Sequence, residues 1–149
     1  LDSLLFLKVL PAAARKILDL GSGAGLPGIP IKIARSDVEL TLLESRRKRA
    51  SFLSTVVREL ALRDVRVVNA RLEDVTTDLA GQFDAVVMRC AGKFEDLAAP
   101  ATRLLVPGGQ IVASGPPTEE ALTLGEWTSV SIDESSLPRR FAVYQGPRS

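Results

Sequence analysis

Short apolar runs alternate with amphipathic stretches along most of the chain. The apolar runs have the length of buried strands, and the stretches between them repeat apolar positions with helical spacing. Strands that alternate with helices in this way are typical of βαβ units and of a mostly parallel sheet. The predicted strands are residues 16–20, 39–43, 65–69, 83–88 and 110–114.

The stretches between those strands predict helices at residues 28–35, 46–62 and 94–105, with a weak turn of helix after Glu73. Pro107-Gly108-Gly109 is expected to end the third helix and to lead into the fifth strand. Residues 1–10 predict an apolar helix that packs on the core.

The last part of the chain has a different pattern. Two β-rich runs, residues 127–132 and 141–145, are separated by a polar stretch that contains Pro138. They suit an antiparallel pair that closes the sheet. Because 149 residues is the length of one domain, we expect a single domain over residues 1–149. Its expected fold class is α/β and Rossmann-like, with a mostly parallel sheet and a C-terminal antiparallel strand.

Composition excludes several kinds of chemistry. The chain has no histidine and one cysteine, Cys90, so the usual zinc sites and histidine-dependent nucleophiles cannot form. Apolar residues make up 46% of the chain, yet no run approaches the roughly 20 apolar residues of a membrane span. The lone cysteine and the lack of a secretory pattern predict a cytoplasmic protein with neither metal nor membrane partner. With a net charge of +1, any RNA-binding surface has to be local.

A glycine turn, residues 19–25, follows the first predicted strand. Gly21, Gly23 and Gly25 allow positive φ and let a ligand approach the backbone without a Cβ in the way. Pro27 suits the first position of the helix that follows. Asp19 stands two residues before the first glycine, which resembles the first motif of class I methyltransferases. In those enzymes the acid approaches the amino-acid end of S-adenosylmethionine.

Two other interpretations explain part of this turn. Residues 23–28 satisfy the dinucleotide pattern G-x-G-x-x-G, with Glu44 nineteen residues after Gly25. That pattern starts two residues late and leaves Asp19 and Gly21 without a role. A plain glycine turn would need no ligand at all. S-adenosylmethionine accounts for more of the residues and is the expected cofactor.

Residues after the next two strands suit the rest of such a ligand. Glu44 ends the second predicted strand, where its two oxygens could accept both ribose hydroxyls. Alternatively, it caps the following helix near the positive end of the helix dipole. Leu72 and Glu73 follow the third strand and would lie beside the adenine, although plain capping explains Glu73 equally well.

The chain also resembles one particular family, GidB/RsmG, in a series of short segments. These are Asp2-Ser3-Leu4, the glycine turn with Leu26-Pro27-Gly28-Ile29-Pro30, Leu42-Leu43-Glu44-Ser45, Lys48-Arg49-Ala50, Phe52-Leu53, Arg71-Leu72-Glu73, and Phe83-Asp84 leading to Arg89. That family methylates guanine N7 in the small-subunit (16S) ribosomal RNA. The similarity covers residues 2 to about 92 well, and the Leu-Pro-Gly-Ile-Pro segment is its most specific part.

The resemblance implies a role for each matching position. It implies cofactor contacts at Gly21, Leu26, Leu72, Glu73 and Arg89. Family members carry an additional helical segment before the position of Asp2, which this sequence lacks, and many have lysine where Ser114 stands. These two departures bear on RNA docking and on full activity.

The implied chemistry needs little from the protein. Guanine N7 carries a lone pair at neutral pH, so no general base is required, and positioning could lower the barrier by up to ~7–11 kcal/mol. Arg89 ends the fourth strand and faces the ligand crevice of an open α/β sheet, where it could orient guanine or the methionine carboxylate. A salt bridge at the rim is the alternative. Cys90 lacks the adjoining proline of cytosine-C5 nucleophiles and suits a core position better.

Four cations, Arg46-Arg47-Lys48-Arg49, open the second long helix. Cations in a first helical turn oppose the helix dipole by ~0.3–1 kcal/mol, so something should compensate them. The helical wheel extends its apolar stripe, which runs from Phe52 to Leu60, towards Arg46 and Arg49. RNA phosphate near the carboxyl edge of the sheet would supply the compensation. A solvated charged face is the alternative.

Together these patterns predict an S-adenosylmethionine-dependent methyltransferase acting on guanine N7 of small-subunit ribosomal RNA, with Arg89 as its catalytic residue. A methyltransferase with a small-molecule or protein acceptor would show the same pattern of strands and glycines. A non-catalytic homologue that only binds the cofactor is a third interpretation, which Ser114 and the expected absence of the N-terminal segment allow.

Overall fold

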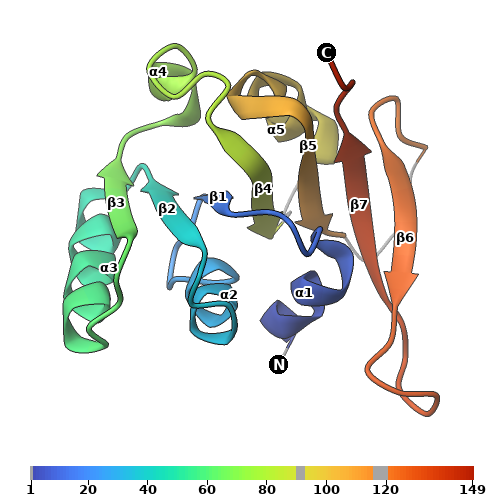
Figure 1. Cartoon of the computed structure of the whole chain (residues 1–149), viewed down its shortest axis with the longest axis horizontal. Helices are drawn as coiled ribbons and strands as arrows, with labels where there is room; N and C mark the ends of the chain where they lie inside the picture. The colour runs from blue at the N-terminus through green and yellow to red at the C-terminus, as the bar shows by residue number, and fades with distance from the viewer. Residues whose placement is uncertain (1, 90–92, 116–120) are drawn as a thin grey trace.

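The computed structural model describes residues 2–89, 93–115 and 121–149. Within these ranges seven strands form one sheet in the order β3-β2-β1-β4-β5-β7-β6 (Figure 1). Strands β1 to β5 are parallel, whereas β7 pairs with β5 and β6 pairs with β7 in antiparallel fashion. The strands are β1 (Lys16–Leu20), β2 (Glu39–Glu44), β3 (Val65–Asn69), β4 (Phe83–Arg89), β5 (Leu105–Ser114), β6 (Glu126–Val130) and β7 (Arg139–Gln145).

The sheet confirms the predicted α/β fold and its antiparallel C-terminal edge. β1 and β3 have the predicted bounds, and β2 and β4 each continue one residue further, to Glu44 and Arg89. The strand order reverses between β1 and β4. In open α/β sheets ligands bind at this reversal, outside the carboxyl ends of the strands.

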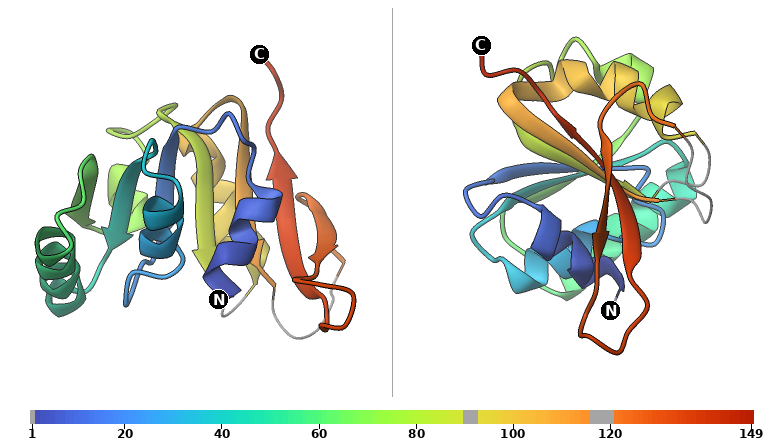
Figure 2. Two further views of the ribbon diagram at one scale, coloured as in Figure 1. Left: turned by 60° about the horizontal axis from the view of Figure 1, so that its bottom comes forward. Right: turned by 90° about the vertical axis from the view of Figure 1, so that its right-hand side faces the viewer.

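Helical segments cover both faces of the sheet (Figure 2). On one face lie η1 (Asp2–Leu5), α1 (Phe6–Val9), α2 (Gly28–Ala34) and α3 (Arg47–Glu59); on the other lie α4 (Leu72–Val75), α5 (Phe94–Ala101) and η2 (Thr102–Leu104). Neighbouring residues of a strand point to opposite faces. In β1, Ile17 therefore packs with Phe6 and Leu53 in one core, while Leu18 packs with Phe94 in the other. Burial on both faces explains the nearly continuous apolar runs.

The prediction around the fifth strand was wrong in its bounds. Helix α5 ends at Ala101, and β5 begins at Leu105 instead of Gln110. The Pro-Gly-Gly segment lies inside β5, where the partner residues jump from Phe83–Leu105 to Ala85–Gln110. Such a break in register is where a strand tolerates proline, because the missing N–H interrupts no ladder hydrogen bond.

Three helix predictions also need correction. Helix α3 covers residues 47–59 instead of 46–62. Phe52 and Leu60 are 52% and 50% exposed, so they do not belong to the buried stripe, which consists of Ala50 and Leu53 with Val56 and Val57 partly buried. Pro27 precedes helix α2 as its N-cap instead of occupying the first helical position. The N-terminal segment is a 3₁₀ turn followed by a four-residue helix. Among the described residues, no helix is long and apolar enough to cross a membrane.

Candidate functional site

The glycine turn connects β1 to α2 at the carboxyl edge of the sheet. Gly21, Gly23 and Gly25 all have positive φ, at 71°, 54° and 91°. The N–H groups of Gly21 and Ser22 both donate to the carbonyl of Leu43, at 2.9 and 3.1 Å, and so fasten the turn to the end of β2. A Cβ added at Gly21 would meet nothing within 4 Å, so the space beside the turn is open. The turn therefore has the shape that the sequence predicted for a ligand-binding loop.

Asp19 lies beneath the turn and is fully buried. Its Oδ2 accepts the N–H of Gly28 at 2.8 Å, which holds the start of α2 against β1. A Cβ at Gly28 would lie 2.7 Å from this same oxygen, so only glycine fits there. Asp19 Oδ1 is buried without a hydrogen-bond partner. Burial raises the pKa of Asp19 to about 8, although the N–H of Gly28 lowers it.

These features fit the predicted cofactor. The open space beside Gly21 lets a ligand reach the backbone, and a positive charge nearby would stabilise the ionised form of the buried Asp19 carboxyl. S-adenosylmethionine carries such charge on its ammonium and sulfonium groups. Asp19 also has a structural role, as the anchor of Gly28. A direct contact between Asp19 and the cofactor stays a prediction.

Glu44 ends β2 and is only 4% exposed. Its Oε2 accepts the N–H of Arg46 at 3.0 Å, and its Oε1 lies 3.9 Å from Nη1 of Arg49. Glu44 therefore holds the N-cap residue of helix α3, Arg46, without capping an N–H of the helix itself, and it partly compensates the cations of the first turn. Since Leu43, next to it, accepts the N–H groups of the glycine turn, Glu44 also lies beside that turn. Its contact with a ribose stays a prediction.

Leu72 and Glu73 begin the short helix α4, which follows β3. Leu72 is buried and packs in the same core as Leu20 and Leu43, at the ends of β1 and β2. Glu73 is exposed in the first turn of the helix. Both residues are thus at the carboxyl edge, on the side of β2 and β3, where the adenine end of a ligand was expected.

Arg89 is the last residue of β4, and its charge is one of those that lower the pKa of Asp19. It lines a cleft of about 620 Å³ that also exposes Leu26 and Ser114. The structure therefore brings Arg89, the glycine turn and Ser114, which stands where many family members have lysine, together at the carboxyl edge of the sheet. Cys90, the next residue, lies outside the described residues.

The same cleft contains residues that the sequence patterns did not single out. Its wall on the side of β7 is formed by Pro138, Arg139, Arg140 and Phe141, and on the side of the N-terminus by Asp2, Ser3 and Phe6. Phe6 and Phe141 meet edge to face, 4.9 Å between ring centroids, and so hold the two sides together. The adjacent arginines Arg139 and Arg140, at the start of β7, could have indicated this wall from the sequence. They were not singled out, because their stretch was interpreted only as polar.

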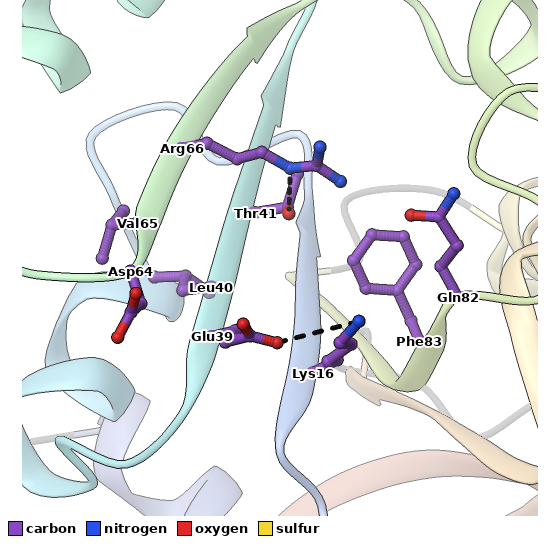
Figure 3. Close-up of a pocket in the computed structure, with 9 residues that line it drawn as sticks. All are labelled: Lys16, Glu39, Leu40, Thr41, Asp64, Val65, Arg66, Gln82 and Phe83. Carbon is purple, nitrogen blue, oxygen red and sulfur yellow. Dashed lines mark hydrogen bonds and ion pairs between the residues drawn. The ribbon is translucent and has the colours of Figure 1, made fainter.

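A second hollow, of about 380 Å³, lies where β1 to β4 begin (Figure 3). There Lys16 and Glu39 form an ion pair at 3.8 Å, and Nε of Arg66 donates to the Thr41 hydroxyl at 2.9 Å. None of the predicted site residues lines it. Because ligands of open α/β sheets bind at the opposite, carboxyl edge, the Arg89 cleft and the glycine turn form the candidate site. No group of three metal-ligating side chains occurs in the described parts of the chain.

Solved structures with a similar fold include one in complex with AdoMet. M. jannaschii TYW2, solved in complex with AdoMet, matches with a TM-score of 0.71 at 15% identity, over 97% of this chain and 72% of that one. A predicted O-methyltransferase from Agrobacterium tumefaciens matches with a TM-score of 0.73 at 25% identity, over 97% of this chain and 81% of that one. These similarities show the class I methyltransferase fold.

Sequence relatives are more specific. Proteins named ribosomal RNA small subunit methyltransferase G are 38% identical over 113 residues in Clostridium botulinum and 40% identical over 131 residues in Sorangium cellulosum. These alignments cover 74% and 85% of this chain, and 47% and 55% of the relatives. The chain thus spans about half the length of the curated relatives it matches. The family described as GidB, rRNA small subunit methyltransferase G, matches residues 1–134. The chain belongs to this family.

Proposed function

We propose that this chain is the catalytic domain of a methyltransferase that transfers a methyl group from S-adenosylmethionine to guanine N7 in small-subunit ribosomal RNA. The observation that carries the proposal is the family match over residues 1–134, which includes the glycine turn and Arg89. Relatives that share this stretch are named for methylation of the small-subunit RNA. An RNA substrate of this kind also implies that the protein works in the cytoplasm.

The cofactor would lie across the carboxyl ends of β1, β2 and β4. Its amino-acid end would meet the turn at Gly21, Gly23 and Gly25, with Leu26 beside it and Asp19 beneath. Its ribose would lie against Glu44 and its adenine against Leu72 and Glu73, because these residues follow β2 and β3 at the same edge. Arg89 at the end of β4 would stand near the methionine carboxylate or the acceptor base.

The chemistry of this site is positioning without proton transfer. Bound S-adenosylmethionine supplies an electrophilic methyl group, and guanine N7 offers a lone pair at neutral pH. The chain accordingly needs no general base, and it has no histidine to act as one. Leu26, which is exposed in the Arg89 cleft, would help to exclude water and hold a flat base, and the guanidinium of Arg89 would orient it.

Ribosomal RNA would reach this edge over a positively charged surface. Arg46 and Arg49 at the start of α3 are exposed beside the turn, and we assign to them contacts with RNA phosphates. The ion pair of Arg49 with Glu44 is long, at 3.9 Å, and leaves the Arg49 side chain 55% exposed. A phosphate could therefore approach Arg49 without displacing Glu44.

Methyl transfer to small ribosomal subunits that lack the modification tests the proposal. We expect labelled methyl groups to enter the RNA and to map to N7 of one guanine, and an Arg89→Ala variant to lose most of this activity. Labelling of a protein or small molecule instead would favour the alternative acceptors. Tight cofactor binding without any transfer would favour a non-catalytic homologue, an alternative that Ser114 in the cleft keeps open.

A further inference from the structure

The Arg89 cleft is lined by both apolar and charged residues. Leu26, Pro30 and Pro138 contribute accessible apolar surface, whereas Phe6 and Phe141 are buried. The N-terminal turn η1 forms one side, and the start of β7 forms the other. Two contacts join these sides: the edge-to-face pair of Phe6 and Phe141, and an ion pair between Asp2 and Arg139. This mixed lining suits a flat base that carries polar groups along its edges.

The charges that line the cleft are unequal in number. Three arginines, Arg89, Arg139 and Arg140, contribute to its lining, and Asp2 is the one acidic residue among the described residues that line it. Oδ1 of Asp2 lies 3.4 Å from Nη2 of Arg139. The two side chains remain 69% and 61% exposed, so a ligand can reach them. A lone carboxylate among cations is a specific acceptor for hydrogen bonds within an otherwise donor-rich site.

Guanine and adenine differ in the hydrogen-bonding groups that a carboxylate could recognise. Its N1–H and its 2-amino group are two adjacent donors, whereas adenine has an acceptor at N1 and no 2-amino group. A carboxylate can accept from both guanine donors at once, because it has two oxygens. Arginine can donate to O6. These contacts leave N7 free, on the far edge of the base from N1.

We propose that Asp2 selects guanine in this cleft by accepting hydrogen bonds from N1–H and the 2-amino group. The inference rests on the proposed function, because it identifies the cleft as the acceptor site. Asp2 is a specificity residue in this arrangement, and Arg139 holds its carboxylate towards the cleft. A purely structural role would instead confine Asp2 to the exposed ion pair with Arg139, which contributes little to stability.

Binding of mononucleotides separates the two roles. The chain, saturated with S-adenosylhomocysteine, is titrated with GMP, IMP and AMP. IMP differs from GMP only in lacking the 2-amino group, so the ratio of their dissociation constants reports that one contact. We expect GMP to bind about tenfold more tightly than IMP, the usual size of a hydrogen bond to a charged group, and AMP to bind most weakly. Asp2→Asn should bring the GMP-to-IMP ratio close to one.

Arg139→Gln is the matched control, because it breaks the same ion pair but keeps the carboxylate. It should weaken all three nucleotides and preserve the GMP-to-IMP ratio. The proposal is overturned if no nucleotide binds, if the unchanged chain binds GMP and IMP equally, or if the two variants alter the ratio alike. Guanine preference that depends on Asp2, in a chain that methylates no RNA, would support this inference while refuting the proposed function.

Discussion

Asp19 shows at the scale of a single residue how the fold alters a side chain's chemistry. The end of β1 buries its carboxyl completely, and the N–H of Gly28 donates a hydrogen bond to Oδ2. Of the charged groups nearby, Glu44 raises its pKa further and Arg89 lowers it. Desolvation outweighs these effects, so the pKa rises from 3.8 to about 8. The folded chain at neutral pH therefore holds a proton that the unfolded chain releases.

This proton predicts how stability depends on pH. Between about pH 4 and pH 8, unfolding releases the Asp19 proton, so the free energy of unfolding falls as the pH rises and levels off above pH 8. Asp19→Asn should remove this fall, because the amide keeps the shape but does not titrate. Urea denaturation at intervals from pH 5 to pH 9 measures both proteins.

Asp96→Asn is a suitable control, since Asp96 is exposed on α5 and should leave the wild-type pH dependence in place. Parallel stability curves for the wild type and Asp19→Asn across this range would contradict the assignment.

Helix α3 has an unfavourable distribution of charge at its N-terminus. It begins with Arg47, Lys48 and Arg49, and cations at a helix N-terminus oppose the dipole. Glu44 of the preceding strand offsets part of this, through the Arg46 N–H and the Arg49 guanidinium. Residues 46–49 carry four positive charges, however, and Glu44 forms an ion pair with one of them, Arg49. The remaining positive charge lies at the same edge as the glycine turn, which is where RNA is proposed to bind.

The salt dependence of RNA binding tests this role of α3. Each phosphate contact contributes roughly 0.7–0.9 to the slope of log affinity against log salt concentration. Replacing Arg46 and Arg49 together by glutamine should therefore reduce the slope by about 1.4–1.8. Arg58→Gln, in the last turn of the same helix, should leave it unchanged. An equal slope in the double variant and the wild type would place these arginines on a solvated face.

At the scale of the whole molecule, local patterns were sufficient for most of the fold. Strands β1 and β3 could be located to the residue, because apolar runs buried on both faces stand out from amphipathic helices. The two β-rich runs indicated the strands of the tail, whereas periodicity alone could not show that they pair in antiparallel fashion. The start of β5 could not be found, because its Pro-Gly-Gly segment signals a turn locally, and only pairing with β4 and β7 makes it a strand.

Some residues of the candidate site could be predicted from the sequence, and others could not. The glycine turn, Glu44, Leu72 and Arg89 could be found from the sequence, because each follows directly after a strand and the carboxyl ends of parallel strands share an edge. Arg139 and Phe141 could not, because β7 runs antiparallel and its beginning, not its end, reaches that edge. Asp2 reaches the cleft through tertiary contacts, the packing of Phe6 on Phe141 and its own ion pair with Arg139.

Calorimetric titration with S-adenosylmethionine, and separately with NAD, tests the central claim most directly. The turn from Asp19 to Gly25 satisfies parts of both patterns, and every functional proposal for this chain depends on which ligand it takes. We predict saturable binding of S-adenosylmethionine and of S-adenosylhomocysteine, with no measurable heat from NAD at the same concentrations. Tighter binding of NAD than of S-adenosylmethionine would contradict the account.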